Sequence, residues 1–249
     1  MKKKIAILFT SLFASLSLSS TSFAIIAPPD VGPFPHCDYA FLDVDCYHDY
    51  FKAIDFLRAE GIVGGYSDGT FHPDSSINRA EMMKIIAEGA KKYFEWEDDT
   101  FDEYANESCF PDVPAEAWYS RYVCYGKKHG WVQGYADGTF RPSQNINFVE
   151  ALKITMRGYA VVEYSKDTDP WYRGIVDRAS ELNYIPYTIS GFTQELNRGE
   201  MADMITRIIK YNEDLLGEYL TSRVDLQVTY ETIEAGQDVS YEPIRIQGK

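Results

Sequence analysis

The chain has 249 residues, enough for one or two domains, and its 45% hydrophobic and 25% charged composition is ordinary for a folded protein. Its 38 acidic residues outnumber 24 Lys and Arg residues, which gives a net charge of −14. Nucleic-acid-binding domains carry clustered basic charge. The composition therefore excludes wholesale disorder and argues against nucleic acid as a partner.

Residues 1–24 have the form of an export signal. Three lysines precede an apolar run over residues 5–18, and Ser22 and Ala24 stand at cleavage spacing. We expect cleavage before Ile25, with a retained membrane anchor as the alternative. Beyond this segment no stretch approaches the roughly 18 consecutive apolar residues of a membrane helix. We therefore expect no transmembrane span in the mature chain.

The chain contains four cysteines, Cys37, Cys46, Cys109 and Cys124. An exported protein meets an oxidising environment, so two disulfides are the default expectation. The sequential pairs Cys37–Cys46 and Cys109–Cys124 are favoured because each closes a short local loop, although two other pairings exist. Zinc is the competing interpretation, but the cysteines lack CxxC spacing and the histidines form no paired ligand motif. We expect neither a metal site nor a cofactor.

Two stretches of the chain occur twice, at one constant displacement. The motif Phe-x-Asp-Val occupies residues 41–44 and 110–113, and Gly-Tyr-x-Asp-Gly-Thr-Phe occupies residues 65–71 and 134–140. Equal displacement of separate motifs indicates two copies of one unit.

A third copy is weaker. Trp171 and Tyr172 match Trp118 and Tyr119, and residues 196–200 match residues 77–81. Three residues are missing where the Asp-Gly-Thr-Phe turn should be, and the Phe-x-Asp-Val opening is absent.

Each copy is expected to form a helix, a turn and a second helix. In the first copy, a helix from Asp49 to Glu60 is followed by an Asp-Gly turn, after which Phe71 folds back onto the core. The second helix begins at Asn78, which forms a capping box with Glu81. The other copies repeat this box as Asn147 with Glu150 and Asn197 with Glu200. The apolar faces expected to supply the core are Met82, Ile85 and Ile86; Leu152, Ile154 and Met156; and Met201, Met204, Ile205 and Ile208.

These patterns divide the mature chain into five parts. They are repeat 1 (37–94), an acidic linker (95–108), repeat 2 (109–161), a degenerate repeat 3 (162–220) and a C-terminal extension (221–249). The linker contains seven acidic residues and no glycine, so a solvated connection fits better than a calcium loop. The extension alternates apolar and polar residues around Ala235 and Gly236, which predicts a β-hairpin or the edge of a small sheet.

The repeated string resembles the S-layer homology domain of bacterial surface proteins, over about residues 37–215. The resemblance implies a mainly α fold in which three tandem helix-turn-helix repeats form a pseudo-threefold assembly with grooves between neighbouring repeats. It also implies a secreted protein that attaches non-covalently to the cell wall, at the bacterial cell surface, through a polysaccharide that often carries a pyruvate ketal. A neutral glycan held against tyrosines is the alternative ligand.

The resemblance also implies which residues bind the polysaccharide. Arg79 and Arg198 stand at the family's arginine position, where a guanidinium can bind a carboxylate. The supporting positions are Asp68, Gly69, Asp137, Gly138, Trp118 and Trp171. Structural roles are the alternative: the Asp-Gly pairs form turns, and the tryptophans belong to the core. Phe148 replaces the arginine in repeat 2, so we expect one complete groove, built around repeat 1.

Other functions are weaker candidates. The sequence has no nucleophile elbow, phosphate loop or zinc-protease motif, and its acidic pairs lie in expected turns and caps, so we expect no enzyme. Protein interaction is the more serious rival, in which the repeats assemble with surface proteins or present residues 221–249 to a protein partner without glycan recognition.

Overall fold

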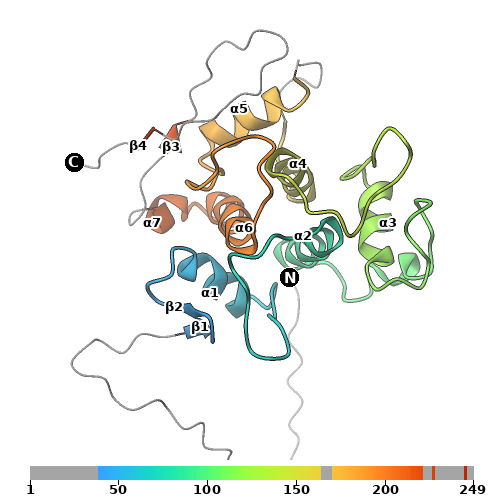
Figure 1. The fold of residues 1–249 in the computed structure, drawn as a ribbon, viewed down its shortest axis with the longest axis horizontal. Helices are drawn as coiled ribbons and strands as arrows, with labels where there is room; N and C mark the ends of the chain where they lie inside the picture. The colour runs from blue at the N-terminus through green and yellow to red at the C-terminus, as the bar shows by residue number, and fades with distance from the viewer. Residues whose placement is uncertain (1–38, 164–169, 221–225, 228–243, 246–249) are drawn as a thin grey trace, which may run out of the picture. The chain divides into compact units, whose positions relative to one another are not determined.

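The computed structural model describes residues 39–163, 170–220, 226–227 and 244–245, all within a compact unit of residues 37–249 (Figure 1). Its helices are α1 (Phe51–Ala59), α2 (Arg79–Tyr93), the 3-10 helix η1 (Asp102–Tyr104), α3 (Ser120–Lys128), α4 (Phe148–Gly158), α5 (Arg173–Glu181), α6 (Arg198–Asn212) and α7 (Leu216–Leu220). Its strands are β1 (Tyr39–Phe41), β2 (Val44–Asp45), β3 (Leu226–Gln227) and β4 (Ile244–Arg245), paired as β1–β2 and β3–β4. The expected mainly α fold is confirmed.

The inner helices α2, α4 and α6 each begin directly after an asparagine, as the repeat predicts. The Asn78 side chain accepts a hydrogen bond from the Glu81 backbone N–H at 2.9 Å, and the Glu81 carboxylate accepts one from the Asn78 N–H at 3.3 Å. Helix α6 has the same capping box at Asn197 and Glu200. Helix α4 keeps only the asparagine half, because the Glu150 carboxylate bonds to other side chains. Each cap stabilises its helix by about 1 kcal/mol.

The residues that precede these caps form a closed ring of backbone hydrogen bonds. The Ile77 N–H donates to the Leu196 carbonyl at 3.0 Å, the Leu196 N–H to the Ile146 carbonyl at 2.9 Å, and the Ile146 N–H to the Ile77 carbonyl at 3.0 Å. All three side chains are fully buried. Because three equivalent residues close on one another, the repeats are related by a pseudo-threefold axis through this ring, around which Figure 1 shows α2, α4 and α6.

Each outer helix packs against the inner helix of the preceding repeat. Helix α3 contacts α2, α5 contacts α4, and α1 contacts α6, which closes the circle from repeat 3 to repeat 1. The inner-helix side chains predicted to form the core are all buried. A repeat of the sequence is therefore completed in space by its neighbours.

The acidic linker is more ordered than its composition suggests. Its carboxylates are exposed, but it contains η1, and Phe101 and Tyr104 are buried. Both rings lie edge-on to Tyr125 of α3, with centroids 4.9 and 5.4 Å away. Aromatic contacts therefore fix the linker against repeat 2, while its acidic side chains face solvent.

The disulfide between Cys109 and Cys124 is confirmed, and it joins the first residue of repeat 2 to α3. Cys46 is also disulfide-bonded. Cys37, the partner expected for it, lies outside the described residues, as does the export signal over residues 1–24.

Part of the C-terminal extension can be compared with its prediction. Strands β3 and β4 pair antiparallel, with Leu226 opposite Arg245 and Gln227 opposite Ile244. This pairing agrees with the expected β segment. The rest of residues 221–249, including Ala235 and Gly236, lies outside the described residues, so the hairpin turn and the expected protein-partner surface stay predictions.

Candidate functional site

The Asp-Gly-Thr-Phe loops are held by the aspartate of the Phe-x-Asp-Val motif. The Asp112 carboxylate accepts hydrogen bonds from the backbone N–H groups of Phe140 at 2.8 Å and Arg141 at 2.6 Å. Asp43 makes the same pair of bonds in repeat 1, at 2.8 and 2.7 Å. Arg141 has a φ of 60°, and this left-handed conformation turns both N–H groups toward one carboxylate. In repeats 1 and 2 the opening motif therefore fixes the loop that follows later in the same repeat.

The aspartates of the turns have a local role. Asp137 accepts hydrogen bonds from the Thr139 N–H at 3.0 Å, the Thr139 hydroxyl at 2.6 Å and Arg141 at 2.9 Å. Asp68 accepts the same two bonds from Thr70. The threonine bonds, first of all those of the hydroxyls, lower the pKa of both exposed carboxyls. These aspartates hold their own turns.

The glycine before each loop tyrosine is required by a close approach. Gly134 has a φ of 77°, and a Cβ atom there would press into the Phe110 ring and the Thr139 carbonyl oxygen. Gly65 has the same geometry in repeat 1, with a φ of 68°. This contact lets the loop fold over the Phe-x-Asp-Val segment.

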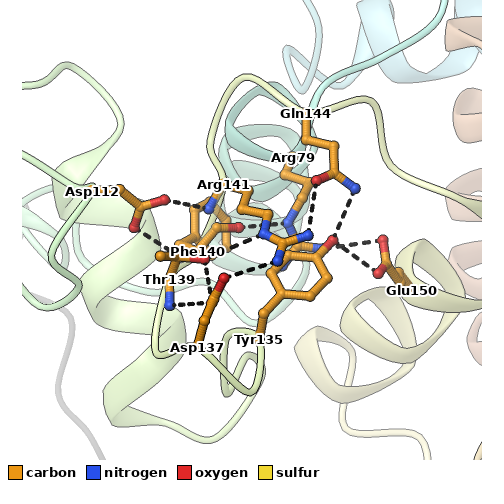
Figure 2. Close-up of polar contacts among 9 residues, drawn as sticks. All are labelled: Arg79, Asp112, Tyr135, Asp137, Thr139, Phe140, Arg141, Gln144 and Glu150. Carbon is orange, nitrogen blue, oxygen red and sulfur yellow. Dashed lines mark hydrogen bonds and ion pairs between the residues drawn. The ribbon is translucent and has the colours of Figure 1, made fainter.

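Arg79 leaves its own repeat and inserts into the loop of repeat 2 (Figure 2). Its side chain is only 6% exposed, its Nε donates to the Phe140 carbonyl at 2.8 Å, and its Nη1 pairs with Glu150 at 3.2 Å. The guanidinium carbon lies 4.8 Å from the Tyr135 ring centroid and 4.7 Å from that of Phe140. The Tyr135 hydroxyl donates to Glu150 at 2.9 Å, and burial raises the pKa of Tyr135.

Arg198 makes the equivalent crossing from repeat 3 to repeat 1. It is 7% exposed, and its Nε donates to the Phe71 carbonyl at 2.7 Å. The guanidinium carbon lies 4.9 and 4.6 Å from the ring centroids of Tyr66 and Phe71. Within the described residues, Arg198 forms no ion pair, and Nη1 and Nη2 have no hydrogen-bond acceptor. These nitrogens remain available to an anion.

Both arginines line grooves that are built alike. Groove 1, of about 240 Å³, is lined by residues 62–66, Glu81, Lys84, Ile85, Trp118 and Arg198. Groove 2, of about 400 Å³, is lined by residues 131–136, Glu150, Lys153, Ile154, Trp171 and Arg79. Small-ligand sites span about 300–1,000 Å³, so groove 2 lies within this range and groove 1 lies just below it. Each groove takes its arginine from one repeat, its loop and inner helix from the next, and its tryptophan from the third.

A tryptophan and a lysine face each other in each groove. Trp118 is 53% exposed and Trp171 is 45% exposed, so the interpretation of these residues as core is wrong. The Lys84 ammonium lies 5.9 Å from the Trp118 ring centroid, and that of Lys153 lies 4.6 Å from the Trp171 centroid. Lys84 forms no ion pair within the part of the chain that the structure describes. Each groove thus combines an open aromatic face with two cationic side chains.

The third equivalent position lacks the residues that the two grooves share. Phe148, 1% exposed, replaces the arginine, Asp203 replaces the lysine, and Asp49 replaces the tryptophan. The Asp203 carboxylate accepts a hydrogen bond from Arg207 Nε at 3.0 Å and another from the Tyr219 hydroxyl on α7. This position therefore has no equivalent of the groove arginine, lysine or tryptophan, and it lacks the chemistry of grooves 1 and 2.

Comparison with known sequences supports the family resemblance. The sequence model of the S-layer homology domain matches residues 40–83 and 110–152. These two segments are S-layer homology repeats. The third repeat predicted from the sequence lies outside the match, although α5 and α6 occupy the positions of α1 and α2 around the central ring.

Relatives share this sequence over much of the chain. A "Cell surface protein" of Thermoanaerobacter kivui is 27% identical over 97% of this chain and 30% of its own length. A "Middle cell wall protein" of Brevibacillus brevis is 26% identical over 78% of this chain and 16% of its own length. A "Cellulosome-anchoring protein" of Acetivibrio thermocellus is 29% identical over 63% of this chain and 35% of its own length. The chain therefore spans about a third or less of the length of these relatives.

The structure pairs the predicted site residues differently from the sequence interpretation. Arg79, Arg198, Trp118 and Trp171 line the grooves, whereas Asp68, Gly69, Asp137 and Gly138 are absent from both linings and form turns. The expectation that only one groove has a complete set of arginine and tryptophan is wrong, because both grooves contain these residues. Arg79 and Arg198 each enter the next repeat, so Phe148 affects the position in repeat 3 and leaves groove 2 with Arg79.

Sequence reasoning missed Lys84 and Lys153. Both follow the capping glutamate of their inner helix by three positions, so they are equivalent residues of repeats 1 and 2. That equivalence is the signal that could have found them.

Among the described residues, no helix has the length and apolar character needed to cross a membrane. No group of three or more potential metal-ligating side chains is found in that same part of the chain.

Proposed function

We propose that the chain is a non-catalytic anchoring module that is exported and binds an acidic cell-wall polysaccharide at grooves 1 and 2. The main support is that the two grooves have the same composition. Each contains an arginine, a lysine and an exposed tryptophan at equivalent positions, contributed by three repeats. The names of the relatives, which refer to the cell surface, the cell wall and anchoring, agree with this role.

A sugar with a pyruvate ketal suits this chemistry. Its carboxylate would accept hydrogen bonds from the unoccupied Arg198 nitrogens and from Lys84, while the apolar ring face would lie on Trp118. In groove 2, Arg79 is partly neutralised by Glu150, so Lys153 would contribute more of the positive charge.

The net charge of −14 makes the anchoring short-ranged. An anionic polymer is repelled by the protein as a whole, and salt screens this repulsion beyond about 8–10 Å. Affinity must therefore arise inside the grooves, where Arg198 is held at 7% exposure by a carbonyl and two aromatic rings. We expect binding to depend on a few groove residues.

Retention on wall sacculi tests the proposal. Lys84→Ala, Lys153→Ala and the double variant are compared with Lys128→Ala, which removes a lysine from the exposed end of α3. Each groove variant should weaken its site by about 10- to 150-fold, the value of one hydrogen bond to a charged group. The double variant should be released, and the Lys128 control should be retained.

The polysaccharide itself supplies the second arm of the test. Sacculi stripped of their attached polysaccharide by hydrofluoric acid should no longer retain the wild-type protein. Undiminished retention on stripped sacculi, or retention of the double variant on intact sacculi, would refute glycan anchoring through the grooves.

A further inference from the structure

We propose that groove 2 continues into a second, aromatic subsite that binds a further sugar of the same polysaccharide strand, which groove 1 cannot do. This inference rests on the proposed function. The subsite, here called the aromatic shelf, is a hollow of about 300 Å³ whose main residues are Phe94, Trp96, Tyr125, His129, Trp131 and Arg157.

The aromatic shelf is continuous with groove 2. Trp131 lines both hollows, and its indole packs beside the small residues Gly126 of α3 and Gly158 of α4. Along α4, Lys153 and Ile154 of groove 2 are followed four positions later by Arg157 and Gly158 of the shelf. Four residues advance a helix by about 6 Å. This step is comparable to the length that one pyranose adds to a glycan.

The shelf has the chemistry of a sugar subsite. The rings of Phe94 and Trp96 stack with centroids 5.4 Å apart, and the indoles of Trp96 and Trp131 stack with centroids 6.2 Å apart. His129 is exposed and stacks on Tyr125. Arg157 is held by Glu163 and the Gly130 carbonyl, so its planar group is fixed at the rim. Flat aromatic walls with a few placed polar groups are typical of small-molecule sites, and the apolar C–H face of a hexopyranose fits such a wall.

Repeat 1 has a different hollow at the equivalent position. Residues Glu60 and Glu88 stand there in place of His129 and Arg157, and Ile62 stands in place of Trp131. The carboxylates of Glu60, Glu88, Glu95 and Asp98 line this hollow against only two lysines, Lys91 and Lys92. An acidic polysaccharide would be repelled there. The two grooves are therefore expected to bind different lengths of the same polymer.

The four tryptophans of the chain make the test specific, because they lie in different parts of the two grooves and the shelf. Trp118 lies in groove 1, Trp171 in groove 2, and Trp131 between groove 2 and the shelf. Trp96 lies in the shelf and also lines the acidic hollow of repeat 1, where an acidic sugar would be repelled. The protein would be labelled with 5-fluorotryptophan and titrated by fluorine NMR. The probes are a methyl hexopyranoside with a 4,6-pyruvate ketal and the trisaccharide that carries this sugar at one end.

We expect the monosaccharide to shift the Trp118 and Trp171 resonances and the trisaccharide to shift Trp96 as well. Groove 2 should bind the trisaccharide about fivefold more tightly than the monosaccharide, and groove 1 should bind them equally. His129→Glu, which introduces the residue of repeat 1 at an exposed position, and Trp96→Ala should each abolish this gain and leave monosaccharide binding unchanged.

The two proposals fail in distinguishable ways. If neither probe shifts any tryptophan, the proposed function itself is refuted for this sugar class. If both probes shift Trp118 and Trp171 equally and Trp96 does not respond, the grooves bind sugar but the aromatic shelf is overturned. A preserved gain in both His129→Glu and Trp96→Ala would overturn it as well.

Discussion

Replacing Asp112 by Ala should destabilise the protein by loosening the loop of groove 2. The carboxylate accepts hydrogen bonds from the Phe140 and Arg141 N–H groups at 2.8 and 2.6 Å. A hydrogen bond to a charged group contributes about 1.5–3 kcal/mol. Arg141 is exposed, so water can replace part of its bond. We therefore expect the free energy of unfolding to fall by about 2–4 kcal/mol.

Urea unfolding measures this loss, and amide hydrogen exchange locates it. Asp112→Asn keeps one acceptor oxygen and should lose about half as much. Asp99→Ala, at an exposed linker carboxylate, should change stability by less than about 0.5 kcal/mol. The Phe140 amide should exchange faster in Asp112→Ala than in the wild type. A loss equal to that of the Asp99 control, with unchanged exchange at Phe140, would refute the clamp.

Three further changes test other parts of the structure. Ile77→Ala empties a fully buried position in the central ring and should cost about 2–5 kcal/mol in thermal unfolding, so a loss below about 1 kcal/mol would contradict the packing. The pKa of Asp137 is lowered on folding, so its stabilisation is present above the unfolded value of about 3.9 and is lost as pH falls through the folded value. Carboxyl NMR should show this low pKa and its rise in Thr139→Ala; an ordinary pKa in the wild type would disprove the turn geometry. Serine at both Cys109 and Cys124 opens a bridge across 15 residues and should lower the urea-unfolding free energy by about 3 kcal/mol, whereas an unchanged midpoint would show that the bridge adds nothing.

Local features of the fold could be predicted because they depend on nearby residues. The capping asparagines Asn78, Asn147 and Asn197 begin their helices as expected, and Cys109 pairs with Cys124. In each case, the signal and the partner are separated by at most 15 residues. The repetition of the motifs then extends these predictions from repeat 1 to repeat 2.

The composition of the grooves could not be predicted in the same way. Arg79 bonds to Phe140 and Arg198 bonds to Phe71, and these partners are 61 and 127 residues away. A sequence motif shows that an arginine follows the helix cap, but not which repeat receives its side chain. The prediction that Phe148 deprives its own repeat of a groove arginine is therefore wrong, because groove 2 takes Arg79 from repeat 1.

The tryptophans show a second limit. The family resemblance predicts that Trp118 and Trp171 support polysaccharide binding, but large aromatic side chains are highly buried on average, so the sequence left a core role open as the alternative. Both are instead exposed, because each lies just before the outer helix of one repeat and faces the inner helix of the preceding one. Exposure here depends on how repeats meet, which composition does not encode.

The crossing of Arg198 from the last repeat to the first also decides what can be removed from the chain. A linear stack of repeats leaves two ends that need special capping units. Here every copy is completed by another, so no copy is terminal. Deleting repeat 3, whose own position lacks the groove residues, would take Arg198 from groove 1 and Trp171 from groove 2. The most degenerate copy is thus indispensable to both of the others.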